Sequence, residues 1–451
     1  MALALAILPV LATPVRGQVF TCFQTTKLTA SDTAAGDLLG RVAVSGDVAV
    51  VGASSDDCAA GADCGSAYVY RFNGSSWLQE QKLTASDAAT LDSFGLAVSI
   101  GGEAAVVGTP NDDCPAGTLC GSAYVFRFNG VSWMQEQKLT ASDAADGDRF
   151  GISVSVDGDV AIVGAWGASC AAGAACGAAY LYRFNGSTWN QEQKLTASDA
   201  AAFDEFGFSV SVDGAVAVVG AYEDDCAAGA ECGSAYVFRF NGATWVEEQK
   251  LVAADAAAVD FFGVSTAVQG SVALVGANWD NCPAGGACGS AYVFRFNGAS
   301  WVQEQKLAAS DAAAGDRFGS SVSLAGDVAL IGSRESDCAA GSNCGSAYVF
   351  RFNGSSWDQI GKMFASDAAA GDVFGGSVST DGAVGFAGAV GHDCGADANC
   401  GAAYVFSCQT VDPGPVPALS QRGWWLLIVV VGAAGAVVFG ARRPGAALGP
   451  S

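Results

Sequence analysis

The sequence predicts an all-β protein: a seven-bladed β-propeller of four-stranded antiparallel blades. The first observation is a sevenfold repeat, because the tract KLTASD or a close variant starts at Lys27, Lys82, Lys138, Lys194, Lys250, Lys306 and Lys362. These starts are 55 residues apart once and 56 residues apart five times. The second is that the apolar residues come in short, strand-like runs. Repeats of this length and content form a ring or a stack.

The third copy illustrates the strands that each unit is expected to contain. Alternating apolar and polar residues predict strands over 152–156, 159–164, 178–184 and 189–196. The pairs Asp157-Gly158 and Asn185-Gly186 predict two-residue hairpin turns of type I′. Four short antiparallel strands make one propeller blade, and seven blades close a ring.

The net charge limits the partners of the chain. It is −24, with 21 Lys and Arg against 45 Asp and Glu. Nucleic acid is excluded as a partner, because phosphate binding needs basic patches. An acidic surface keeps a protein soluble or attracts cations.

Both ends of the chain carry signals of the cell envelope. Residues 1–17 read as a signal peptide, residues 18–410 as the propeller and residues 411–423 as a Pro-rich linker. Residues 424–441 are an apolar stretch long enough to span a bilayer, and residues 442–451 follow as a cytoplasmic tail that begins with two arginines. Together with residues 416–420, this end resembles the IPTL-type sorting signal of bacterial envelope proteins. The expected location is the cell envelope or surface, with one C-terminal membrane helix as the anchor.

Two short motifs recur at fixed places in the units. Phe-Gly opens the first strand at Phe94, Phe150, Phe206, Phe262, Phe318 and Phe374, with Leu39-Gly40 in the first unit. A Val-Gly-Ala tract, as at Val219-Gly220-Ala221, ends the second strand. Over residues 20–408 the chain therefore resembles the FG-GAP repeat of integrin α-subunit propellers. The calcium loops of that family are not expected here, because the corresponding connections are only two residues long and cannot surround an ion.

Fourteen of the 16 cysteines form pairs separated by five residues. The pairs are Cys58–Cys64, Cys114–Cys120, Cys170–Cys176, Cys226–Cys232, Cys282–Cys288, Cys338–Cys344 and Cys394–Cys400. A zinc site would need four ligands and histidine is nearly absent, so local disulfides are favoured in an exported chain.

The other two cysteines predict how the ring closes. Cys22 takes the repeat position of Trp77, and Cys408 takes that of Phe352. These positions flank the Asn-Gly hairpin and should lie opposite each other. The N-terminal segment is therefore expected to be the outer strand of the last blade, joined to it by a Cys22–Cys408 disulfide.

Two aspartates recur in every connection between consecutive units. They are Asp32 and Asp37, Asp87 and Asp92, Asp143 and Asp148, Asp199 and Asp204, Asp255 and Asp260, Asp311 and Asp316, and Asp367 and Asp372. A further acid precedes the first cysteine at Asp57, Asp113, Asp225, Asp337 and Asp393. The favoured interpretation is that these carboxylates shape turns. The alternative is a ring of weak metal sites for a divalent cation, with Ca²⁺ as the candidate cofactor.

Few residues of possible functional importance occur only once. His392 is the only histidine and is expected to be solvated in its loop. Trp166, Tyr222 and Trp279 follow second strands on the acidic face and are candidates for stacking on a sugar or a partner. No unique pair of acid and base accompanies them, so catalysis is not indicated.

The function predicted from the sequence is a non-enzymatic bacterial surface module for adhesion or for binding a protein or carbohydrate ligand. The ligand is expected on the acidic face, where the connections between blades and the disulfide loops meet. The alternatives are an envelope hydrolase with its site at the channel mouth and a purely structural envelope protein.

Overall fold

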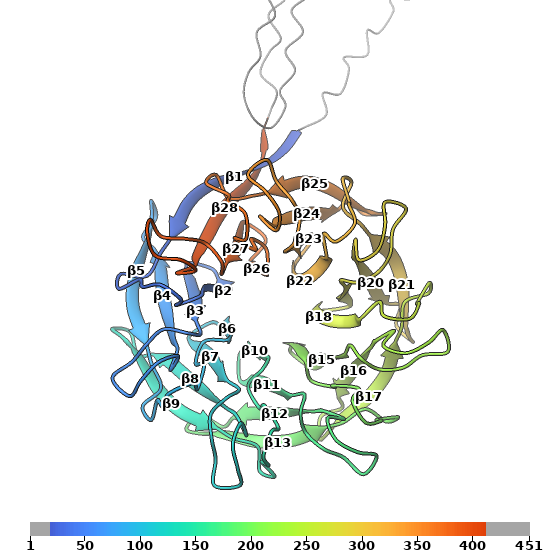
Figure 1. Cartoon of the computed structure of the whole chain (residues 1–451). Helices are drawn as coiled ribbons and strands as arrows, with labels where there is room; N and C mark the ends of the chain where they lie inside the picture. Colours follow the sequence, from blue (N-terminus) through green and yellow to red (C-terminus); the bar gives the residue numbers. More distant parts are fainter. Residues whose placement is uncertain (1–18, 412–451) are drawn as a thin grey trace, which may run out of the picture. The chain divides into compact units, whose positions relative to one another are not determined.

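The computed structural model describes residues 19–411, which form seven four-stranded antiparallel sheets around a central channel (Figure 1). Each sheet is one blade, with its first strand at the channel and its last strand at the rim. The predicted seven-bladed propeller is confirmed. The predicted signal peptide, linker, sorting-like segment, membrane span and tail lie outside the described residues, apart from Val411 at the start of the linker. No helix within residues 19–411 has the length and hydropathy of a membrane span.

Four concentric sets of strands make up the ring. The innermost strands are β2 (Leu39–Ser45), β6 (Ala97–Gly101), β10 (Val154–Asp157), β14 (Ser209–Asp213), β18 (Phe262–Gln269), β22 (Phe318–Ala325) and β26 (Ser377–Thr380). The second strands are β3 (Val48–Ala53), β7 (Ala104–Thr109), β11 (Val160–Ala165), β15 (Val216–Ala221), β19 (Val272–Ala277), β23 (Val328–Ser333) and β27 (Val384–Ala389). The third strands are β4 (Ser66–Phe72), β8 (Ser122–Phe128), β12 (Ala178–Phe184), β16 (Ser234–Phe240), β20 (Ser290–Phe296), β24 (Ser346–Phe352) and β28 (Ala402–Val411). The outermost strands are β5 (Trp77–Leu83), β9 (Trp133–Leu139), β13 (Trp189–Leu195), β17 (Trp245–Leu251), β21 (Trp301–Leu307), β25 (Trp357–Met363) and β1 (Val19–Leu28).

The turns between the strands differ from the prediction. Asp157 pairs with Val160, so the centre of the first hairpin is Gly158-Asp159 rather than Asp157-Gly158. Gly158 has a φ of 55°, whereas Asp159 is not among the residues with positive φ. A type I′ turn needs positive φ at both central residues, so that prediction was wrong.

The Asn-Gly hairpin has a loop of four residues instead of two, because Phe184 pairs with Trp189. The side chain of Asn185 organises this loop, since its Oδ1 accepts the backbone N–H groups of Ser187 and Thr188. The recurrence of Asn at this position thus reflects a side-chain turn rather than a left-handed backbone.

The chain closes its own ring. The last blade has the strand order β1-β28-β27-β26, so the N-terminal strand is the outer strand of the C-terminal blade, as predicted (Figure 1). Cys22 on β1 and Cys408 on β28 form a disulfide with a Cα–Cα distance of 4.1 Å. The seven local cysteine pairs are also disulfides, and no free cysteine occurs within residues 19–411.

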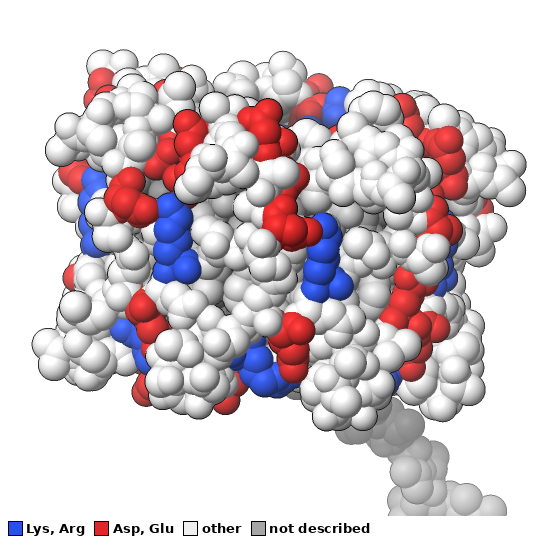
Figure 2. All heavy atoms as spheres, turned by 90° about the horizontal axis from the view of Figure 1, so that it is seen from below, with Lys and Arg blue, Asp and Glu red and all other residues white. Residues whose placement is uncertain are grey.

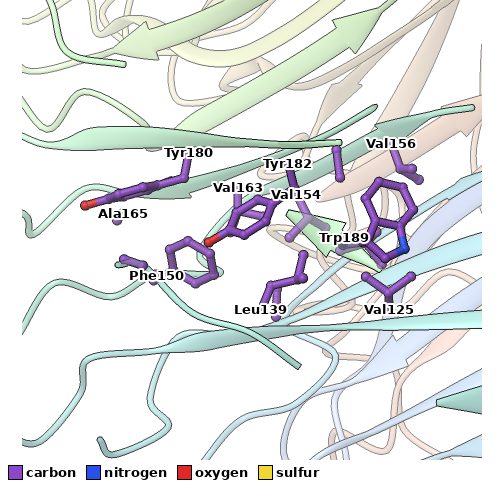
Figure 3. Packing of buried hydrophobic residues seen from close by; sticks show 14 of the residues in the cluster. Val125, Leu139, Phe150, Val154, Val156, Val163, Ala165, Tyr180, Tyr182 and Trp189 are labelled. Carbon is purple, nitrogen blue, oxygen red and sulfur yellow. The ribbon is translucent and has the colours of Figure 1, made fainter. Parts of the chain in front are cut away.

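The hydrophobic core lies between the blades. Figure 3 shows the cluster between the second and third blades, where Phe150 packs beside Tyr180 and Tyr182 of β12. The Phe150 ring is fully buried and meets both tyrosine rings edge-on, with centroid distances of 5.4 and 6.1 Å. The same cluster contains Val125 and Leu139 of the second blade, so the phenylalanine of the Phe-Gly motif lies in a core that neighbouring sheets share, which explains why it recurs in six units.

Neighbouring blades also approach each other closely at the channel. The Ser155 hydroxyl accepts the N–H of Val212 from the next innermost strand at 3.1 Å. At Gly164 an added Cβ would overlap the carbonyl oxygen of Gly207 in the following blade. Glycine in the Val-Gly-Ala tract is therefore required by the spacing of the blades rather than by a turn.

A glutamine clasp joins the rims of most neighbouring blades. Gln249 accepts the N–H of Trp301 at 2.7 Å and donates to its carbonyl at 2.8 Å. Gln81, Gln137, Gln193 and Gln305 make the same pair of bonds to the tryptophan of the next blade. The last blade lacks this clasp on both sides, because Gly361 and Thr26 occupy the glutamine position there.

Candidate functional site on the mouth face

One end of the propeller carries the candidate site, and we call it the mouth face. It is formed by the connections from each outermost strand to the next innermost strand, together with the disulfide loops between the second and third strands. Backbone bonds tie the two sets of loops together, as between Phe94 N–H and the Cys64 carbonyl at 2.9 Å. The predicted aspartates and the seven local disulfides lie in these loops.

The first aspartate of each predicted pair binds a lysine. Asp199 accepts the Lys250 ammonium at 2.7 Å and the Tyr236 hydroxyl at 2.8 Å. The same lysine contact occurs in every blade, at Asp32, Asp87, Asp143, Asp255, Asp311 and Asp367. Burial raises the pKa of Asp199, but the ammonium and the hydroxyl outweigh burial and hold the pKa below its ordinary value. Figure 2 shows acidic and basic side chains beside one another around the wall.

The second aspartate of each pair shapes the loop. Asp204 is buried, and its Oδ2 accepts the backbone N–H of Ala201 at 2.6 Å. The equivalent bond is made by Asp37, Asp92, Asp148, Asp260, Asp316 and Asp372. Burial raises the pKa of Asp204 to about 6. These hydrogen bonds are the ones expected if the aspartates shape the turns.

The acid before the first cysteine has a similar local role. Asp57 Oδ1 accepts the backbone N–H of Asp63 at 3.0 Å, across the disulfide loop. Asp113, Asp225, Asp337 and Asp393 make the same bond in their blades. This carboxylate therefore closes the loop that the disulfide also closes.

The sequence prediction missed a buried acid one residue earlier. Asp224 contacts the Lys250 ammonium at 2.6 Å, opposite Asp199. Asp56, Asp112 and Asp280 contact their lysines in the same way. The signal was present in the sequence, because an aspartate stands two residues before the first cysteine in four of the seven units.

His392 takes this position in the last blade, and the expectation that it is solvated was wrong. Only 6 % of its surface is exposed. Its Nε2 lies 2.5 Å from the Lys27 ammonium, and its Nδ1 lies 3.4 Å from Asp372. His392 thus replaces the buried aspartate as the second partner of the lysine.

The lysines occupy the positions at which the predicted ring of cations would bind. Their ammonium groups lie between the carboxylates that a metal ion would need. Across residues 19–411, no group of three or more His, Cys, Asp or Glu side chains is arranged to hold a metal ion. The calcium sites stay a prediction, and the fourth blade offers the sharpest test of them. A pocket of about 400 Å³ there is lined by the acids Asp199, Asp204, Glu223, Asp224, Asp225 and Glu231 together with Lys250.

We expect calcium to leave the thermal midpoint of the native chain unchanged, because the Lys250 ammonium already binds the Asp199 and Asp224 carboxylates. Replacing the lysine (Lys250→Met) should allow calcium to raise the midpoint, since the carboxylates then lack a counter-charge. Thermal unfolding with calcium or a chelator measures both. Arg239→Met, which removes an arginine paired with Glu248 on the wall, is the control. A calcium-dependent rise in the native chain would instead establish the cation ring.

Four positions around the channel mouth change their chemistry from blade to blade. The residue before the Phe-Gly motif is Leu38, Ser93, Arg149, Glu205, Phe261, Arg317 or Val373, and in all seven blades it has a φ between 56° and 59°. The residue after the motif is Leu96, Ile152, Phe208, Val264, Ser320 or Gly376 in blades two to seven. The two residues that follow the second strand also vary. In blades three to six they are Trp166-Gly167, Tyr222-Glu223, Asn278-Trp279 and Arg334-Glu335. The same scaffold therefore presents a different set of groups in each blade.

Two neighbouring blades bring four aromatic residues into one row at the mouth. Tyr222 lies 4.4 Å from Phe208 and 5.4 Å from Phe261, measured between ring centroids. Trp279 follows at 5.7 Å from Phe261, and the Arg317 guanidinium lies 4.2 Å from the Trp279 ring centroid. Tyr222 and Trp279, two of the three predicted stacking residues, thus lie in one row.

This row forms one wall of a central pocket. The pocket has a volume of about 330 Å³, and its lining includes Arg41, Arg317 and Arg334, the aromatic row, Asn278 and Ser320. Arg41, Phe208, Val264, Ser320 and Gly376 also line the channel below it. The pocket therefore opens into the channel, and the sequence prediction did not identify it.

Comparisons with known proteins agree with the fold. A family model described as FG-GAP repeat matches seven segments, residues 22–70, 77–126, 133–182, 189–238, 245–294, 301–350 and 357–406. Each segment begins near the start of an outermost strand and ends in the third strand of the next blade, so the sequence repeat is offset from the structural blade. No curated protein matched the chain.

Proposed function

Because the chain belongs to the FG-GAP repeat family, we propose that it is a non-enzymatic binding module of the bacterial cell envelope, with its ligand on the mouth face. Eight disulfides support export to an oxidising compartment. Anchoring by residues 424–441 would present the propeller to partners outside the membrane. Adhesion is the role that fits such a display.

The observation that carries this proposal is the difference between the blades at the mouth. Residues present in every blade hold the scaffold together, as the Lys250–Asp199 pair and Phe206 show. Residues that change from blade to blade cannot serve a shared structural need. In repeat proteins, such variation on one face usually marks the binding surface.

The chemistry of the central pocket favours binding over hydrolysis. Arginine keeps its proton at neutral pH and cannot act as a general base. Aromatic rings supply contact area and stacking rather than proton transfer. The described lining includes no carboxylate or imidazole that could work as an acid–base pair.

A binding screen of the full-length chain against glycans and envelope proteins tests the proposal. For each ligand found, Trp279→Ala and Tyr222→Ala should weaken binding about tenfold or more, as loss of a central aromatic contact does. Met134→Ala is the matched control, since this apolar side chain on the rim is 55 % exposed. A screen without any ligand, or ligands that tolerate both mouth variants, would contradict the proposal.

A further inference from the structure

The central pocket differs in charge from the rest of the chain. The net charge is −24, yet three arginines and no acidic residue line this pocket. Like charges repel, so gathering three guanidinium groups costs free energy unless an anion compensates for them. The arrangement therefore needs an explanation beyond the scaffold.

Arg41 reaches the pocket because the first blade is one residue shorter. Arg41 pairs with Gly52, as Ser265 pairs with Gly276 in the fifth blade, so the arginine stands where that blade has a serine. Among the contacts of the described residues, the Arg41 guanidinium has no hydrogen bond or ion pair. Burial, and then the nearby Arg334, lower the pKa of Arg41 below its ordinary value.

The other two arginines share a single acid. Glu335 contacts Arg317 Nε at 2.7 Å and Arg334 Nε at 3.3 Å. Arg317 and Arg334 thus share the Glu335 carboxylate and Arg41 has none among the described residues, while Glu205 and Glu223 contact Tyr222 on the other side of the pocket. In both ion pairs the arginine atom closest to the carboxylate is Nε.

A buried amide is a second, independent observation that points to a ligand. Asn278 lines the pocket and is 4 % exposed, yet its Oδ1 has no hydrogen-bond partner. Its Nδ2 makes only a long contact with the Ser320 hydroxyl, at 3.5 Å. Unpartnered buried polar atoms are uncommon and cost free energy, so a bound O–H or N–H donor would complete this site.

We propose that the pocket binds the carboxylate of an acidic sugar at the end of a glycan, an inference that rests on the function proposed above. Arg41 and Arg334 hold the carboxylate, because the guanidinium fork matches its two oxygens. Asn278 and Ser320 bond sugar hydroxyls. Trp279 and Phe261 cover the apolar face of the ring, as aromatic residues do in ligand pockets.

The volume of the pocket and the net charge of the protein favour this class of ligand over other anions. A cavity of about 330 Å³ is at the small end for ligand pockets and suits one terminal sugar. The acidic surface of the chain repels a polyanion more strongly than a ligand with a single carboxylate. Asn278 and Ser320 are neutral, so they suit the hydroxyl groups of a sugar better than a charged side chain of a peptide.

The test compares uronate-terminated oligosaccharides with the same molecules after reduction of the carboxyl group to an alcohol. We expect the full-length chain to bind the acidic members and to bind the reduced members about tenfold or more weakly. Arg41→Gln should weaken binding of the acidic members to a similar degree. Arg149→Gln is the control, because Arg149 has the same repeat position as Arg317 but bonds to Asn111 and does not line the pocket.

Thermal unfolding separates binding from folding in these variants. Arg41→Gln should keep or raise the thermal midpoint, because it removes a charge that faces Arg334. If Arg41→Gln unfolds, Arg334→Gln tests the same loss of binding. Equal binding of the reduced sugars, or stronger binding of a sugar phosphate or a peptide carboxylate, would overturn this inference and leave the proposed function intact. Absence of every ligand would overturn both.

Discussion

Replacing both Cys22 and Cys408 by serine should lower the free energy of unfolding by up to about 6 kcal/mol. The size of this effect follows from the loop that the disulfide closes, because the two cysteines are 386 residues apart. In the chain-entropy account, a longer loop restricts the unfolded chain more. Denaturant unfolding of the full-length chain measures the loss.

The position of this disulfide adds to its importance. The two junctions beside the last blade lack the glutamine clasp, since Gly361 and Thr26 replace the glutamine. The outer strand β1 is also the only one not joined to its neighbour in the blade by a hairpin. Without the disulfide, β1 should separate first and open the ring.

The local disulfides provide the matched control. A Cys58→Ser/Cys64→Ser variant opens a loop of seven residues, and its expected loss is about 2 kcal/mol. The pair Cys22→Trp/Cys408→Phe would restore the aromatic pair of the other blades, which in the third blade lies 5.4 Å apart. We expect this pair to recover only part of the loss. Equal losses for the terminal and the local disulfide would contradict the closure account.

Phe206→Ala should destabilise the propeller by about 3–5 kcal/mol. The Phe206 ring is fully buried between the third and fourth blades and meets the Tyr236 and Phe238 rings edge-on at 5.4 and 6.0 Å. Removing the ring leaves a cavity, because the two β-sheets cannot move toward each other to fill it. The measurement is the midpoint of denaturant unfolding at constant m-value.

A phenylalanine three residues earlier gives the control for this prediction. Phe203 is 62 % exposed in the same loop, so Phe203→Ala should change the free energy of unfolding by no more than about 0.5 kcal/mol. The contrast separates the contribution of the motif from the general effect of losing a ring. A small loss for Phe206→Ala would mean that the motif is not what holds the blades together.

The repeat explains why so much of the fold could be predicted. Seven copies in one register show which residues are shared, and the missing outer strand at the C-terminus has its counterpart at the N-terminus. The position of Cys22 relative to Trp77 therefore predicts both the closing strand and its disulfide partner. Local spacing likewise predicts the other disulfides.

Contacts between loops and strands were harder to predict. The Lys250–Asp224 pair joins the outermost strand of the fourth blade to the disulfide loop of the same blade, and the burial of Asp224 and His392 depends on the packing of the disulfide loop in each blade. Predicting the central pocket would require the arrangement of five blades, because the residues that line it are far apart in sequence. A comparison of the repeats position by position would have located the variable mouth, although not the convergence of Arg41 and Arg334.

The central claim is that the shared residues build the ring and the variable mouth binds the ligand. Hydrogen–deuterium exchange with and without a ligand from the screen tests this most directly. We expect ligand to slow exchange in residues 38–42, 261–265, 317–320 and 334–336, which surround the mouth. Slower exchange confined to the hairpin loops on the opposite face, such as residues 73–76 and 185–188, would contradict the claim.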